Sequence, residues 1–87
     1  MDTASPQKPH IEYPRRWAYR IVGSSEADIR AHVARCLAGS EYELVLARQS
    51  RAGRYVSLNL SLVVNDESER QTIFEQVSSH ESVRLVL

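Results

Sequence analysis

The segment from Arg54 to Val64 constrains the fold more than any other part of the chain, because its polarity alternates residue by residue. The apolar and the polar members of this alternation are Val56, Leu58, Leu60 and Leu62, and Tyr55, Ser57, Asn59 and Ser61. Side chains of a β-strand point in turn to the two faces of a sheet. This period of two therefore predicts a long strand with one buried face and one face in contact with water or a partner.

Three other segments are predicted as strands. Residues 16–22 alternate and end at Gly23, residues 42–48 form a second run, and residues 83–87 are aliphatic and β-branched around one arginine. We expect the last of these segments to be ordered and to complete the sheet, because frayed ends of a chain are usually polar.

Two segments have the periodicity of amphipathic helices. The first begins at Ser25, which can cap it with Asp28 three residues later, and the second runs from Asp66, with Glu69 in a similar position, to about His80. The predicted buried stripes are Ile29, Val33, Cys36 and Leu37 in the first helix, and Ile73, Phe74 and Val77 in the second.

The predicted element order is β-α-β-β-α-β, which few topologies can accommodate. Right-handed crossovers place both helices on one face of a four-stranded antiparallel sheet. We therefore predict an α+β ferredoxin-like sandwich with strand order 4-1-3-2 and one open sheet face. Residues 1–14, which hold all three prolines, are predicted as a flexible arm, and residues 15–87 as a single domain.

The alternation also assigns side chains to the two faces of this sheet. The predicted core face holds Trp17, Tyr19, Ile21, Leu44, Leu46, Val56, Leu58, Leu60, Leu62, Val83, Leu85 and Leu87. The predicted open face holds Ala18, Arg20, Val22, Tyr55, Ser57, Asn59, Ser61, Arg84 and Val86.

Composition limits the classes of function. Lys and Arg total 11, as do Asp and Glu, so the formal net charge is zero, whereas a dedicated nucleic-acid binder usually carries a basic excess. The polar first residues do not have the composition of a signal peptide, and no apolar run approaches the roughly 20 residues of a membrane span. We expect a cytoplasmic protein without membrane contact.

Three motifs resemble the YbeD-like family of small uncharacterised bacterial proteins. They are Tyr13-Pro14 followed by residues 17–23, the hairpin over residues 50–57, and the final run Val83-Arg84-Leu85-Val86-Leu87. The resemblance covers residues 13–87 in matching order and spacing. It implies a ferredoxin-like fold similar to ACT domains, which are small-molecule-sensing regulatory modules, and it brings no activity or active site. Gly23-Ser24-Ser25 departs from the glycine-rich ligand turn of ACT domains.

The predicted open face contains one candidate binding site. In the expected strand order Arg20 and Arg84 are neighbours, with Ser57 and Asn59 beside Arg20. Two guanidinium groups near hydroxyl and amide groups could hold a carboxylate or phosphate of a small anionic metabolite. The same face could instead bind a protein partner, or be a solvated face whose charges limit aggregation.

The turn between the second and third strands is a second candidate surface. Arg48, Arg51 and Arg54 lie in or beside it, and Gly53 is expected to adopt a positive φ. This hairpin is either a tip at which a partner docks or a solvated turn.

Other sites have weaker support. His32 and Cys36 have a spacing that two metal ligands can use, but no second cluster completes a site, so no metal is predicted and Cys36 is assigned to the core. RNA binding would need aromatic side chains on the open face, where Tyr55 stands alone. The acidic residues concentrate in first helical turns, where they complement helix dipoles, so neither catalysis nor a cofactor is predicted.

We therefore predict a non-enzymatic, ACT-like module that regulates or binds a protein partner, or a second copy of itself as a homodimer, through its open sheet face. The alternative is a sensor of a small anionic metabolite at Arg20 and Arg84. A protein interface should expose apolar side chains around Val22, Val45 and Val86, whereas a ligand site should form a concavity beside the arginines.

Overall fold

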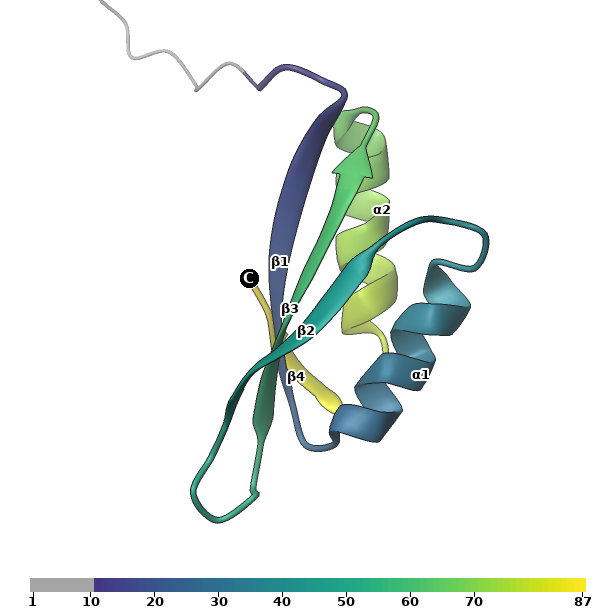
Figure 1. Cartoon of the computed structure of the whole chain (residues 1–87). Helices are drawn as coiled ribbons and strands as arrows, with labels where there is room; N and C mark the ends of the chain where they lie inside the picture. Colours follow the sequence, from purple (N-terminus) through teal and green to yellow (C-terminus); the bar gives the residue numbers. More distant parts are fainter. Residues whose placement is uncertain (1–10) are drawn as a thin grey trace, which may run out of the picture.

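The computed structural model describes residues 11–87, which form six elements in the predicted order. These are β1 (Arg15–Gly23), α1 (Glu26–Cys36), β2 (Glu43–Gln49), β3 (Val56–Val64), α2 (Glu67–Ser78) and β4 (Val83–Val86). The strands form one antiparallel sheet in the order β2-β3-β1-β4, and both helices lie on the same side of it (Figure 1). The predicted ferredoxin-like architecture is confirmed. Neither helix within residues 11–87 has the length and apolarity that a membrane crossing requires.

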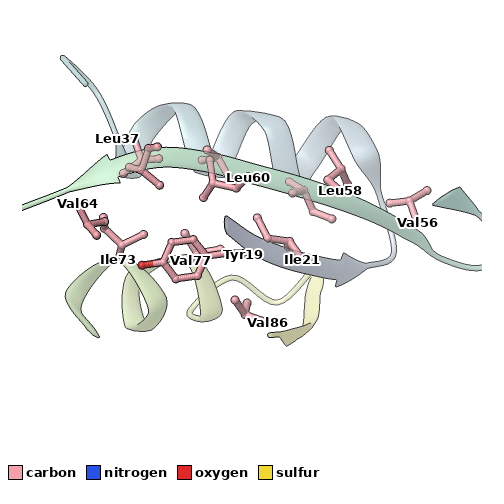
Figure 2. Packing of buried hydrophobic residues seen from close by; sticks show 13 residues of the cluster. Tyr19, Ile21, Leu37, Val56, Leu58, Leu60, Val64, Ile73, Val77 and Val86 are labelled. Atoms are coloured by element: carbon pink, nitrogen blue, oxygen red, sulfur yellow. The ribbon is translucent and has the colours of Figure 1, made fainter. Parts of the chain in front are cut away.

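The hydrophobic core lies between the sheet and the two helices (Figure 2). β3 supplies its centre, since every second side chain of this strand is buried, as the period of two predicts. The buried hydrophobic side chains are Tyr19, Ile21, Ile29, Val33, Leu37, Val56, Leu58, Leu60, Leu62, Val64, Ile73, Val77 and Val86.

Both helices begin at the predicted caps. The Ser25 hydroxyl accepts a hydrogen bond from the Asp28 amide at 3.1 Å, and the Asp66 carboxylate accepts one from the Glu69 amide at 2.7 Å. The Glu69 carboxylate in turn accepts hydrogen bonds from the backbone and side-chain amides of Asn65. These contacts satisfy amide groups that the first turn of a helix leaves without partners.

From Leu85 onward the last strand presents the opposite faces to those predicted, whereas Val83 packs against the core as predicted. Val86 is buried, whereas Leu85 and Leu87 are 49% and 67% exposed, so their assignment to the core is wrong. The cause is a register shift: Gly23 pairs with Val83 while Val22 pairs with Leu85, which leaves Arg84 as an extra residue. One extra residue in a strand exchanges the faces of all residues that follow it.

Gly23 lies at this shift because the chain passes close to its backbone. The Ser24 amide donates a hydrogen bond to the Ser82 carbonyl at 2.9 Å, and the buried Ser82 hydroxyl donates one to the Asp28 carboxylate at 3.0 Å. A Cβ atom at residue 23 would clash with the Ser82 carbonyl oxygen and lie 2.8 Å from Cδ1 of Ile29. Only glycine permits this close approach of the segment that leads into β4.

Three other predicted core side chains are more exposed than expected. Leu46 is exposed because it lies on the edge strand β2, next to an irregularity in its pairing with β3. Phe74 is exposed on α2, and Cys36 is only partly buried at the end of α1.

Described residues of the predicted arm contact the domain. Residues 1–10 lie outside the described residues, but Tyr13 packs against the core and its hydroxyl accepts a hydrogen bond from Nε of Arg70 at 3.1 Å. The Arg70 guanidinium also stacks over Trp17, 4.8 Å from the ring centroid, and the Tyr19 hydroxyl donates to the Arg70 carbonyl at 2.9 Å. These contacts link the start of β1 to α2, and the hydrogen bond to Tyr13 raises the pKa of Arg70.

The register of β4 predicts which of two neighbouring aliphatic residues stabilises the fold. Val86→Ala should lower the free energy of unfolding by about 1–3 kcal/mol, because it opens a cavity in the core. Leu87→Ala removes more atoms but should cost only about 0.5 kcal/mol, because that side chain is exposed. Urea unfolding of the two variants tests this order, and a larger cost for Leu87→Ala would contradict the observed register.

Burial of Tyr19 predicts a loss of stability in alkaline solution. Desolvation raises the pKa of Tyr19 above its ordinary value of 10.0, so the folded state favours the protonated phenol. This contribution is fully present below pH 10 and is lost as the pH rises through the raised pKa. As the pH rises above 10, the urea midpoint of unfolding should fall more steeply in the wild type than in Tyr19→Phe. Tyr55→Phe is the control, because Tyr55 is exposed. If Tyr55→Phe reduced the pH dependence of the urea midpoint as much as Tyr19→Phe does, the assignment of this dependence to Tyr19 would be contradicted.

Candidate functional site

The face of the sheet opposite the helices is the candidate site, and strand register fixes its arrangement. In one row across the strands Arg48 pairs with Ser57, which pairs with Val22, which pairs with Leu85. The next row contains Val45, Asn59, Arg20 and Leu87. We call the whole set the open face: Arg16, Ala18, Arg20, Val22, Glu43, Val45, Arg48, Ser57, Asn59, Ser61, Val63, Leu85 and Leu87.

Only part of the predicted anion site is brought together. Nε of Arg20 donates a hydrogen bond to the Asn59 side-chain carbonyl at 3.4 Å, and Ser57 lies two residues further along β3 on the same face. The predicted neighbour Arg84 is not opposite Arg20. Leu87 occupies that position, because its backbone exchanges hydrogen bonds of 2.9 and 3.0 Å with Arg20. Arg84 lies three residues away along β4, or about 10 Å at the usual rise of a strand.

Ser57 has an unusual environment on the open face. Its hydroxyl oxygen is buried and has no hydrogen-bond partner. Its cross-strand neighbours are Arg48 on one side and Val22 on the other. The hydroxyl is therefore enclosed by neighbouring side chains and is not presented to a ligand in this conformation.

The open face exposes several large apolar side chains. Val45 and Val63 are each more than half exposed, and Leu85 and Leu87 are exposed beside the half-buried Val22. The prediction of an apolar patch at Val22 and Val45 agrees with these exposures. Val86, the third predicted member, lies in the core, and the register shift puts Leu85 and Leu87 on this face in its place. Both leucines were predicted in the core and not as surface residues.

The hairpin between β2 and β3 is ordered by its own hydrogen bonds. The Ser50 hydroxyl accepts from the amides of Arg54 and Tyr55 at 2.9 and 3.1 Å, and the Gly53 amide donates to the Ser50 carbonyl. Gly53 has a φ of 69°, which confirms the predicted positive value. The hairpin extends past the helices at one end of the molecule (Figure 1), and its Arg51 is exposed.

Four arginines on the open face or in the hairpin at its end have no ion-pair partner among residues 11–87. They are Arg20, Arg48, Arg51 and Arg54, and we call them the arginine group. Within residues 11–87 the ion pairs join Arg16 to Glu43 at 3.0 Å, Arg30 to Glu26 at 2.9 Å and Arg70 to Glu67 at 3.6 Å, so none includes a member of this group.

Two cavities lie away from the predicted site. One of about 960 Å³ opens between the helices and the end of β3, and three acidic residues of its lining are already engaged, since Asp66 and Glu69 cap α2 and Glu43 binds Arg16. The other, of about 310 Å³, lies between Trp17 and α2. Neither is lined by Arg20, Ser57, Asn59 or Arg84.

His32 and Cys36 lie close together, but their contacts are those of residues that stabilise the fold. Nε2 of the buried His32 lies 2.8 Å from the Gln76 carbonyl and therefore donates to it, and its ring is tilted by 45° against that of His80, with 4.8 Å between the centroids. The Cys36 sulfur lies 3.5 Å from Nε2, and burial raises the pKa of its thiol, which disfavours the reactive thiolate. Residues 11–87 contain no group of three or more side chains suited to a metal ion.

Comparison with known proteins gives the same fold and a family. The model of the family described as "Protein of unknown function (DUF493)" matches residues 8–87. An uncharacterised protein of Helicobacter pylori strain J99 is 30% identical over 78 residues, covering 88% of this chain and 90% of the relative. A UPF0250 protein of Hahella chejuensis is 26% identical over 91 residues and is matched along the whole of both chains.

A solved structure agrees with the architecture. The solution structure of HP0495 from Helicobacter pylori superposes with a TM-score of 0.83 at 26% identity, covering 100% of this chain and 96% of that one. The resemblance to YbeD-like proteins is confirmed by these matches, and none of the descriptions assigns an activity.

Proposed function

The chain belongs to the DUF493 family of small uncharacterised bacterial proteins, and from that premise we propose that it is a non-enzymatic module that binds a protein partner through its open face. One observation carries this proposal. Leu85 and Leu87 are exposed beside the half-buried Val22 on a sheet face that no element within residues 11–87 covers, and Val45 is exposed on the opposite edge strand of the same face. Contiguous exposed apolar side chains with a polar surround are typical of protein interfaces.

The surroundings of these side chains also favour a protein interface over an active site. Within residues 11–87 the open face carries a single side-chain carboxylate, that of Glu43, and Arg16 already binds it. General acid–base or nucleophilic chemistry needs a titratable pair within hydrogen-bond reach, and this face supplies none among its described residues. Regulation or scaffolding by binding, within the cytoplasm, is the role we infer.

Self-association is the weaker form of this proposal. Two copies packed face to face would bring Arg20 and Arg48 of each against the arginines of the other, and like charges in an interface oppose binding. The metabolite-sensing alternative relied on Arg20 and Arg84 as cross-strand neighbours, and Leu87 pairs with Arg20 instead. We therefore favour a different protein as the partner.

Photo-cross-linking in cells tests the proposed surface. A photoreactive amino acid at position 85 or 45 should give discrete adducts with a protein partner, because both positions are exposed on the open face. Position 74 is the matched control, since Phe74 is a similarly exposed apolar residue on α2. Adducts should be identified by mass spectrometry and should disappear when Leu87→Asp is added.

Two results would contradict the proposal. One is adduct formation from position 74 with none from positions 45 and 85. The other is adducts at all three positions that Leu87→Asp leaves unchanged, since these would reflect random encounters. Adducts between two copies of the chain would replace the different partner with a homodimer, which light scattering over a dilution series would confirm.

A further inference from the structure

The charges of the open face indicate what kind of partner it fits. The whole chain has a formal net charge of zero, but its charges are separated in space. The arginine group gathers at the hairpin end of the open face with no ion pair among residues 11–87. Acidic residues instead occupy the first turns of the helices, at Glu26 and Asp28 and at Glu67 and Glu69. The open face is therefore positive although the chain is neutral.

Apolar side chains alternate with these arginines across the strands. Val22 and Leu85 lie in the same row as Arg48, and Leu87 lies beside Arg20. A surface of this kind matches a partner segment with one apolar side flanked by carboxylates. Arginine is the side chain best suited to such a partner, because its planar guanidinium holds a carboxylate through two parallel hydrogen bonds.

We propose that the partner of the open face is an acidic amphipathic segment of another protein, an inference that rests on the function proposed above. Its apolar side packs on Val22, Leu85 and Leu87, and its carboxylates bind Arg20 and Arg48. The ordered hairpin adds Arg51 and Arg54 at one end of the bound segment.

Nucleic acid fits the same face less well. Single-stranded RNA is held by sheets of this topology through bases stacked on aromatic side chains of the two central strands. In β1 and β3 the open face carries Arg16, Ala18, Arg20, Val22, Ser57, Asn59, Ser61 and Val63, none of which is aromatic. The aliphatic side chains of Val22, Leu85 and Leu87 would gain nothing from a phosphate backbone.

The experiment uses three synthetic peptides of 18 residues that differ only in charge. All share leucines at helical i, i+3, i+4 and i+7 spacing, and their flanking residues are Glu, Gln or Lys. Titration of the ¹⁵N-labelled full chain should show amide shifts at Arg20, Ser57 and Leu85 with the Glu peptide, but none at Ile73 on the helix side. The Gln peptide should bind about 4–25-fold more weakly, since its charged contacts with Arg20 and Arg48, of about 2–5-fold each, are lost.

Two variants test the arginines directly. Arg20→Gln/Arg48→Gln should weaken binding of the Glu peptide by about 4–25-fold, from two exposed charge pairs. Arg35→Gln is the control, because Arg35 is an exposed arginine of α1 without an ion pair among residues 11–87, and it should leave the affinity unchanged. Binding to the wild type should also weaken as NaCl rises from 50 to 300 mM, because salt screens exposed charges.

Each contrary outcome has a distinct meaning. Equal affinity for the three peptides on the open face overturns the acidic partner and leaves the proposed protein-binding function intact. An absence of open-face shifts with every peptide at 2 mM also overturns this inference, and the cross-linking result then decides the proposed function separately. If a single-stranded oligouridine shifts the same amides at lower concentration than the Glu peptide, nucleic acid replaces the acidic segment.

Discussion

The close passage of the Ser82 carbonyl over Gly23 determines where the last strand begins and which of its side chains face outward. The Ser24 amide binds that carbonyl, and β4 starts at the next residue by pairing Val83 with Gly23. The following pair joins Val22 to Leu85, so one residue of β4 has no counterpart in β1. The core receives Val86 and the open face receives Leu85 and Leu87. The character of the open face therefore depends on a backbone contact that involves none of its own side chains.

Much of the fold could be predicted from the sequence because it depends on local patterns that repeat. The alternation of β3, the Ser25 and Asp66 caps and the element order each arise from a few neighbouring residues, and each was confirmed. The orientation of β4 depends instead on how two distant segments meet. A bulge adds one residue without a distinctive local composition, so strict alternation gave the wrong faces.

One part of the candidate site could likewise be predicted from the sequence, and another part could not. Arg20 and Asn59 were predicted correctly as neighbours because β1 and β3 pair without a shift, so their register follows from alternation alone. Arg84 was expected beside Arg20 because the shift in β4 was not foreseen. The hairpin was located by Gly53, whose positive φ is a local requirement of the turn. The position of a residue along a regular strand could be inferred from the sequence, whereas the position of a residue after the register shift in β4 could not.

Net charge was the least informative property of this sequence, for a physical reason. Acidic side chains near a helix start are favoured by the dipole and by free backbone amides, and here Asp66, Glu69 and Asp28 take such positions. Arg20 and Arg48 on the open face have no ion-pair partner among residues 11–87, so their positive potential extends into solvent. A charge sum treats both groups as cancelling, although at 0.15 M salt the field of an exposed charge decays within about 8 Å. A partner that approaches the open face therefore encounters arginines, whose attraction for carboxylates is not offset by acids that lie beyond the sheet.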